Sequence, residues 1–136
     1  MSKKLRIGLI GAGNIAQNAH IPAYLAQDDA ELVAVCDLKK ERAEEVAAKY
    51  GIKHVCNDID ELVALDDVDA VSVCTWNNAH VTAVLAAAKA GKHILCEKPM
   101  AMTVAEAQEM KKAVEEAGGT FMMGFVNRFR GDSQVI

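Results

Sequence analysis

Short apolar runs alternate along the chain with longer segments in which apolar residues recur every three or four positions. A short apolar run that ends at glycine or at polar residues is typical of a strand buried on both faces of a parallel sheet. Six runs of this kind predict strands at residues 5–10, 32–36, 52–55, 70–74, 93–96 and 120–123. Because helical patterns separate these runs, we expect right-handed crossovers and an α/β fold with a doubly wound, mainly parallel sheet.

The segments between the predicted strands carry helix start and stop signals. An early helix is predicted from Asn14, and Pro22 bends or breaks it after His20. Thr103 and Glu106 form a capping box at the start of the last helix. Further helices are predicted at residues 39–50, 58–65, 79–90 and 103–117, with glycines at 51, 91 and 118–119 ending three of them. The side chains expected on buried helix faces are Ile15, Ala19, Tyr24 and Leu25 in the first helix, Ala43, Val46, Ala47 and Tyr50 in the second, Val81, Val84, Leu85 and Ala88 in the fourth, and Val104, Ala107, Met110 and Val114 in the last.

The composition fits one globular domain and argues against several classes of protein. Of the 136 residues, 51% are hydrophobic, 25% are charged and only 4% are aromatic, so aliphatic residues and methionine must build the core. The net charge is -4 without a basic stripe, which argues against a nucleic-acid partner. No apolar stretch is long enough to span a membrane, and no signal-peptide pattern follows Met1. We therefore expect a soluble, cytoplasmic protein.

The four cysteines lack the C-x-x-C pairing that structural zinc sites and redox motifs use. Cys36, Cys56, Cys74 and Cys96 lie far apart in the sequence, and three of them end apolar runs. We expect them to be small buried residues at strand ends in a reducing compartment. No metal site is predicted.

A glycine-rich hexad follows the first predicted strand and opens a helix. The sequence Gly11-Ala12-Gly13-Asn14-Ile15-Ala16 matches G-x-G-x-x-G/A, the dinucleotide-binding fingerprint of the Rossmann fold. Gly11 permits the tight turn, Gly13 lets a pyrophosphate approach the backbone, and Ala16 keeps the helix close to the strand. Because a helix N-terminus attracts phosphate, Gly11, Gly13, Asn14 and Ile15 are expected to bind the cofactor.

Asp37 closes the second predicted strand, 24 residues after Gly13. An acidic side chain here can accept hydrogen bonds from both adenine-ribose hydroxyls and would repel a 2'-phosphate, which favours NAD. Lys39 and Lys40 could bind such a phosphate, so NADP stays open as an alternative cofactor. Asp37 could also be the N-cap of the following helix, and the two roles can coexist.

Two polar turns follow the fourth and fifth predicted strands. Thr75-Trp76-Asn77-Asn78-Ala79-His80 and Glu97-Lys98-Pro99 lie on the carboxyl side of the sheet, where open α/β sheets bind their ligands. A Glu-Lys pair alone is most often a surface ion pair. Its place on the same sheet edge as the glycine loop favours a functional site.

These motifs, with His20-Ile21-Pro22-Ala23 and Gly124-Phe125-x-Asn127-Arg128-Phe129, resemble the glucose-fructose oxidoreductase, inositol dehydrogenase and MocA family of NAD(P)-dependent oxidoreductases. The resemblance covers nearly the whole chain. It implies that Asn77 and His80 line the nicotinamide end of the cofactor groove, with Thr75 also binding the cofactor and Glu97 helping to seat it. Trp76 stands where the family usually has proline.

The resemblance further implies that Lys98 faces both cofactor and substrate as the catalytic residue. Its ammonium would stabilise a developing alkoxide or join a proton relay near the carbinol carbon. The Lys98–Pro99 peptide is expected to be cis, and Arg128 is expected to contribute to the substrate side.

The family has a second, α+β domain that this sequence lacks. We therefore expect a Rossmann domain at residues 1–125 and the start of a connection to the absent domain at 126–136. That domain would dock on an apolar surface, for which the candidates are Phe121, Met122, Met123 and Phe125. Without it, Lys98 lacks its acid-base partners, so the chain alone should be a poor catalyst. The complete enzyme is expected to be an oligomer.

Three functions are compatible with these residues. The first is the NAD(P)-binding domain of an oxidoreductase that transfers hydride between a nicotinamide cofactor and a sugar, inositol or similar polyol. The second is a non-catalytic NAD(H)-binding or regulatory module. The third is a phosphate- or nucleotide-binding domain with no redox role, which would assign no function to Glu97-Lys98-Pro99 or to Asn127-Arg128-Phe129.

Overall fold

The computed structural model, which describes residues 3–132 and 134, contains one six-stranded parallel sheet. The strand order is β3-β2-β1-β4-β5-β6, so the chain winds outward from β1 in one direction and then returns to continue from β4 in the other. The doubly wound parallel sheet predicted from the sequence is confirmed. The strands are β1 (Leu5–Ile10), β2 (Ala30–Cys36), β3 (His54–Cys56), β4 (Ala70–Val73), β5 (His93–Cys96) and β6 (Phe121–Met123).

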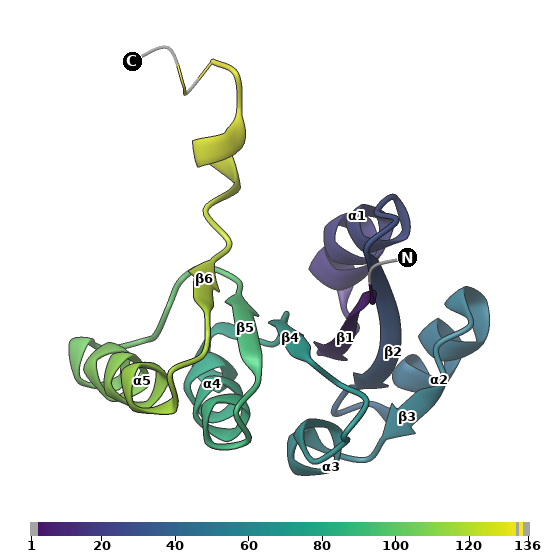
Figure 1. Cartoon of the computed structure of the whole chain (residues 1–136), viewed down its shortest axis with the longest axis horizontal. Coiled ribbons are helices and arrows are strands. Elements are labelled where there is room, and N and C mark those ends of the chain that lie inside the picture. The colour runs from purple at the N-terminus through teal and green to yellow at the C-terminus, as the bar shows by residue number, and fades with distance from the viewer. Residues whose placement is uncertain (1–2, 133, 135–136) are drawn as a thin grey trace.

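Helices cover both faces of the sheet (Figure 1). The helices η1 (Ala16–His20), α1 (Ile21–Leu25) and α2 (Lys40–Tyr50) follow β1 and β2 and share one apolar cluster, while α3 (Ile59–Val63), α4 (His80–Lys89) and α5 (Val104–Ala117) share the other. Two short 3-10 turns, η2 (Asn77–Ala79) and η3 (Val126–Phe129), complete the elements. None of the helices described for residues 3–132 has the length and apolar character needed to cross a membrane.

The ladder between β1 and β2 is longer than the apolar pattern indicated. Ala30 pairs with Leu5 and Glu31 with Arg6, so β2 begins two residues before the apolar run that predicted it. Backbone pairing with β1 recruits these residues, and it does not depend on their side chains. The strand predicted at 52–55 is likewise displaced, to His54–Cys56.

Most predicted helix ends are confirmed. Thr103 and Glu106 form both bonds of the capping box at the start of α5, and Gly51, Gly91 and Gly118 all have positive φ angles just after helices. The predicted burial of Val104 is wrong, because this first-turn side chain is 75% exposed.

The first helix buries a different face from the one predicted. Residues 16–20 form a π-helix, in which the Ile21 N–H donates to the Ala16 carbonyl five residues earlier. The wider turn rotates Ala16, His20 and Ile21 into the core and leaves Ile15 exposed. The predicted burial of Ala19 and Leu25 is also wrong, because both residues are exposed. The chain stays helical through Pro22, which directly follows the π-turn and lies in the first turn of α1.

The segment after β6 leaves the body of the domain, as the yellow end of the chain in Figure 1 shows. It contains η3, and positions 133, 135 and 136 of the connection expected at 126–136 lie outside the described residues. Phe121 and Met123 are half-buried and pack against the core. Met122 and Phe125 are exposed.

Candidate functional site

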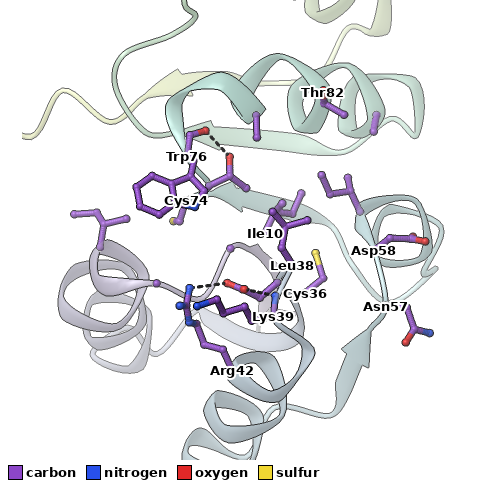
Figure 2. Close-up of a pocket in the computed structure, with 18 of the residues that line it drawn as sticks. Ile10, Cys36, Leu38, Lys39, Arg42, Asn57, Asp58, Cys74, Trp76 and Thr82 are labelled. Carbon is purple, nitrogen blue, oxygen red and sulfur yellow. Dashed lines mark hydrogen bonds and ion pairs between the residues drawn. The ribbon is translucent and has the colours of Figure 1, made fainter.

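A cavity of about 810 Å³ lies at the carboxyl ends of the central strands (Figure 2). It spans the point between β1 and β4 where the strand order reverses, which is where open α/β sheets bind ligands. Its walls come from the ends of β1 and β2, from the turns that follow the first four strands and from the helices beside these turns. The lining residues are Ile10, Gly11, Gly13, Asn14, Ile15 and Gln17 at and after the end of β1, Cys36, Asp37, Leu38, Lys39 and Arg42 at and after the end of β2, Asn57, Asp58, Ile59 and Asp60 after β3, Cys74, Thr75 and Trp76 after β4, and Ala79, Thr82 and Ala86 beside and on α4.

The first two glycines of the fingerprint, Gly11 and Gly13, have different structural roles. Gly11 has a φ of +92°, and a Cβ there would lie 2.7 Å from the carbonyl oxygen of Cys74, so only glycine fits the turn. A Cβ at Gly13 would find only Arg42 Nη1 nearby, at 3.8 Å, so the backbone is open on the side that lines the cavity. An exposed backbone at the start of a helix fits the pyrophosphate of a dinucleotide.

Asp37 ties the glycine loop to the turn after β2. Its Oδ2 accepts a hydrogen bond from the Ala12 N–H and its Oδ1 accepts one from the Lys39 N–H, both at 2.8 Å. The side chain is 8% exposed. The interpretation of Asp37 as a helix N-cap is wrong, because the N-cap of α2 is Lys39 and no side chain caps that helix.

Arg42 is a site residue that the sequence analysis missed. Its Nη1 lies 3.6 Å from Asp37 Oδ2 on the cavity wall, and Figure 2 shows the guanidinium turned toward that carboxylate. Its spacing of three residues from Lys39 on one helix was the available signal, because residues three apart share a helix face. Lys39 and Arg42 line this end of the cavity, whereas Lys40 does not.

The turn after β4 supplies the opposite wall. Thr75 and Trp76 line the cavity, and the Trp76 side chain is 76% exposed. Asn77 is exposed in η2 and is not among the lining residues. His80 lies beneath the wall and is fully buried, with Nδ1 2.7 Å from the Pro99 carbonyl and Nε2 3.2 Å from the Thr75 carbonyl. It therefore links the turns after β4 and β5.

Glu97 and Lys98 lie after β5, outside the cavity lining. The Lys98–Pro99 peptide is cis, as expected. Glu97 Oε1 is 2.7 Å from Nε2 of the buried His20, and Oε2 accepts a hydrogen bond from the Lys98 N–H at 3.2 Å. A Cβ at Gly124 would lie 3.2 Å from the Glu97 carboxyl carbon, so glycine leaves room for this arrangement. Both Glu97 oxygens are thus engaged while the Lys98 side chain is exposed.

Arg128 stands apart from the other predicted site residues. It is exposed in η3, on the segment that leaves the domain, and does not line the cavity. The structure therefore brings together the glycine loop, Asp37 and Thr75, sets Glu97 and Lys98 one strand further along the same edge, and leaves Arg128 remote.

The four cysteines are free and buried, as predicted. Burial in apolar surroundings raises the pKa of Cys36 and of Cys96 to about 12 and that of Cys56 to about 11, and it raises the pKa of Cys74 further. Cys36 and Cys74 line the floor of the cavity. Thiols with such pKa values stay protonated and behave as small apolar groups.

Comparison with known proteins identifies relatives of the whole described fold. The family model for an oxidoreductase family with an NAD-binding Rossmann fold, named for GFO, IDH and MocA, matches residues 5–125. The D-glucoside 3-dehydrogenase of Escherichia coli (strain K12) is 40% identical over 98% of this chain and 38% of its own length. The myo-inositol 2-dehydrogenase of Thermotoga maritima is 38% identical over 92% of this chain and 37% of its own.

Among solved structures, the WlbA dehydrogenase from Bordetella pertussis in complex with NADH and UDP-GlcNAcA has a TM-score of 0.93 and 32% identity. The match covers 98% of this chain and 40% of the WlbA chain. The present chain thus spans roughly two-fifths of the length of these three proteins.

Proposed function

Because the chain belongs to the oxidoreductase family of glucose-fructose oxidoreductase, inositol dehydrogenase and MocA, whose Rossmann fold binds NAD, we propose that it is the dinucleotide-binding part of a dehydrogenase. The substrate would be a sugar, inositol or similar polyol, the chemistry named for the relatives from Escherichia coli and Thermotoga maritima. The observation that carries the proposal is the cavity at the reversal of strand order, with the open backbone of Gly13 on its wall.

The lining residues divide the cavity according to the parts of a dinucleotide. The pyrophosphate would lie against Gly11, Gly13, Asn14 and Ile15 at the helix start. The adenosine would extend over the end of β2, where Asp37 can accept ribose hydroxyls in addition to its two backbone donors, since a carboxylate offers about four acceptor positions. This favours NAD, while Lys39 and Arg42 provide the charge that a 2'-phosphate would need.

The nicotinamide would extend over β4 toward Thr75, in the turn that His80 supports. Asn77, Glu97 and Lys98 would lie beyond Thr75 at the same edge of the sheet. When bound, the cofactor would accept a hydride from a carbinol carbon or return one to a carbonyl. Oxidation also releases the hydroxyl proton, and Lys98 would stabilise the alkoxide oxygen or pass that proton on. Glu97 fixes the backbone at Lys98, and the His80 bond to Pro99 fixes the following residue.

Hydride transfer by this chain alone is proposed to be slow. The Lys98 side chain is exposed to water, and Arg128, the proposed substrate contact, lies on the segment that leaves the domain. An open site cannot exclude water or hold a substrate in a reactive geometry. A second domain, as in the family, would close it.

A non-catalytic NAD(H)-binding module is the second candidate. It is favoured by the observation that every residue lining the cavity precedes Glu97 in the sequence. Slow transfer of label from NADH to a panel of ketoses, or from labelled polyols to NAD+, would distinguish the two, because a pure binding module transfers no hydride in either direction.

Calorimetric titration with NADH, NADPH and AMP tests the proposal. We expect saturable binding of NADH and weaker binding of AMP, which lacks the second phosphate and the nicotinamide. The variant Gly13→Val, whose side chain would occupy the open space beside the loop, should weaken NADH at least tenfold, about 1.4 kcal/mol, with an unchanged far-UV circular dichroism spectrum. Absence of affinity for either dinucleotide in the wild-type chain would refute the proposal.

A further inference from the structure

Trp76 is an exposed aromatic residue on the wall of the cavity. It is the only tryptophan in the chain, its side chain is 76% exposed, and it lines the cavity. Tryptophan carries a large flat apolar surface that folded proteins usually bury in large part. An exposed indole on a cavity wall is therefore available to a ligand.

The backbone that carries this indole is held firmly. The Ala79 N–H donates to the Trp76 carbonyl at 2.9 Å, and the Thr75 hydroxyl donates to the same oxygen at 3.2 Å. The Cys74 N–H donates to the Ile10 carbonyl at 2.8 Å, which ties the start of the turn to β1. Because the backbone is already fixed, contact with a ligand would cost the conformational entropy of only the two rotatable bonds of the side chain.

The position of the turn after β4 determines which end of a bound dinucleotide the indole of Trp76 would contact. Trp76 follows β4, which lies on the opposite side of β1 from β2, the strand that ends at Cys36 before Asp37 and Leu38. Figure 2 shows Trp76 on the α4 side of the cavity and Arg42 on the α2 side. With the pyrophosphate on the loop between them, the adenosine of a bound dinucleotide would lie toward β2 and its nicotinamide toward β4.

We propose that Trp76 contacts the nicotinamide half of the bound dinucleotide by stacking and thereby contributes to the choice of the intact dinucleotide over ligands that lack nicotinamide. This inference rests on the proposed function. Stacking of a nucleobase on an aromatic side chain contributes about 1–3 kcal/mol, and the nicotinamide ring offers a comparable flat surface.

Leu38 provides a matched control at the other end of the cavity. It lines the wall after Asp37 and is 96% exposed, so its truncation removes an exposed apolar side chain without disturbing the core. A contact with adenosine would affect every ligand that contains adenosine. A contact with nicotinamide would affect only the complete dinucleotide.

The test compares NADH with ADP-ribose, which lacks the nicotinamide ring, by calorimetry on the wild-type chain and the variants Trp76→Ala, Trp76→Phe and Leu38→Ala. We expect Trp76→Ala to weaken NADH about tenfold and to leave ADP-ribose unchanged, while Trp76→Phe keeps most of the NADH affinity. Leu38→Ala should weaken both ligands by the same factor. In the wild-type chain, NADH should also quench the Trp76 fluorescence by energy transfer, whereas ADP-ribose should not.

Two results would overturn the inference while leaving the proposed function intact. One is an unchanged NADH affinity in Trp76→Ala, and the other is an equal loss for NADH and ADP-ribose. If the wild-type chain binds neither ligand, the proposed function fails and this inference fails with it. Because Trp76 is exposed, the thermal unfolding midpoint of Trp76→Ala should match the wild type, and this measurement separates lost contact from lost fold.

Discussion

The carboxylate of Asp37 shows how a single side chain can prepare a binding site before a ligand arrives. It accepts the N–H groups of Ala12 and Lys39 and lies beside Arg42, so it connects the loop after β1 with the turn after β2. Hydrogen bonds to a charged acceptor are stronger than neutral ones. The shape of the glycine loop therefore depends on a residue 25 positions away from Ala12.

Replacing Asp37 should change both affinity and selectivity for the cofactor. In Asp37→Ala, NADH loses the acceptor for its ribose hydroxyls and should bind about tenfold more weakly. NADPH should lose less, because the charge that repels its 2'-phosphate is gone and Arg42 is released. Calorimetry with both cofactors measures the ratio of affinities, and a ratio equal to that of the wild type would contradict a role of Asp37 in selection.

The four thiols should be inert in the folded chain. A reagent that attacks thiolates should modify none of them rapidly at pH 8, because burial holds the pKa of Cys36 and Cys96 near 12 and that of Cys56 near 11. All four should react in guanidinium chloride. Since the folded pKa values lie above the unfolded ones, stability should fall as pH rises above about 8.5, the unfolded cysteine value. Rapid labelling of the native protein at pH 8 would contradict this picture.

At the scale of elements, the π-helical turn decides which side chain of the first helix contacts the turn after β5. It turns His20 inward, where Nε2 lies 2.7 Å from Glu97 Oε1. The helix that begins at the glycine loop is thereby bound to the turn that carries Lys98. Irregular turns of this kind are frequent at functional sites.

The contribution of this contact can be measured with two replacements of His20. Gln can still donate an N–H to Glu97, whereas Phe keeps the size of the ring and removes the donor. We expect His20→Phe to lower the free energy of unfolding by about 1–3 kcal/mol, and His20→Gln to lower it by less than half as much. Urea denaturation at pH 7 provides both values, and equal stabilities of the two variants would show that the hydrogen bond contributes nothing.

At the opposite end of the sheet, Arg6 joins β1 to the residue before β4. Its Nε and Nη2 donate to the two oxygens of Asp69 at 2.9 and 2.8 Å, and its backbone N–H donates to Oδ2 at 2.9 Å. These hydrogen bonds hold the pKa of Asp69 well below its usual range. Two neighbouring central strands are thus connected by a three-bond ion pair.

This pair should make stability dependent on pH in acid. A depressed folded pKa stabilises the protein fully above the unfolded pKa of Asp, about 3.9, and the stabilisation is lost as pH falls toward the folded value. Asp69→Asn should therefore cost about 1–3 kcal/mol at pH 7, and the difference from the wild type should shrink below about pH 4. Urea denaturation at several pH values would detect this, and a difference that stays constant down to pH 3 would contradict it.

At the scale of the whole molecule, most of the architecture could be predicted from local patterns. Buried strands and glycine-capped helices have short-range sequence signals, so the six strands, the capping box at Thr103 and the glycine fingerprint could all be recognised. The fold then followed because parallel strands joined by helices admit few topologies. The polar turns at the carboxyl edge of the sheet could be predicted as well, because in this topology the turns that follow the parallel strands lie at one edge.

The parts that could not be predicted depend on contacts between distant residues. His20 and Glu97 are 77 positions apart, and no local pattern reveals a π-turn that brings them together. Arg42 was missed because its role depends on where Asp37 points. The half-burial of Phe121 and Met123 could not be predicted either, because the short sequence of β6 does not tell which of its side chains the core will cover.

The central claim, that a dinucleotide lies in the cavity between the turns after β1, β2 and β4, is tested most directly by NMR. A chain of 14.6 kDa gives well-resolved amide spectra, and NADH can be titrated into the labelled protein. We predict shift changes concentrated at residues 11–16, 37–42 and 74–79, with the amides around Lys92 at the opposite end of the sheet unaffected. Saturating NADH that leaves the spectrum unchanged, or that shifts the Lys92 end instead, would contradict the account.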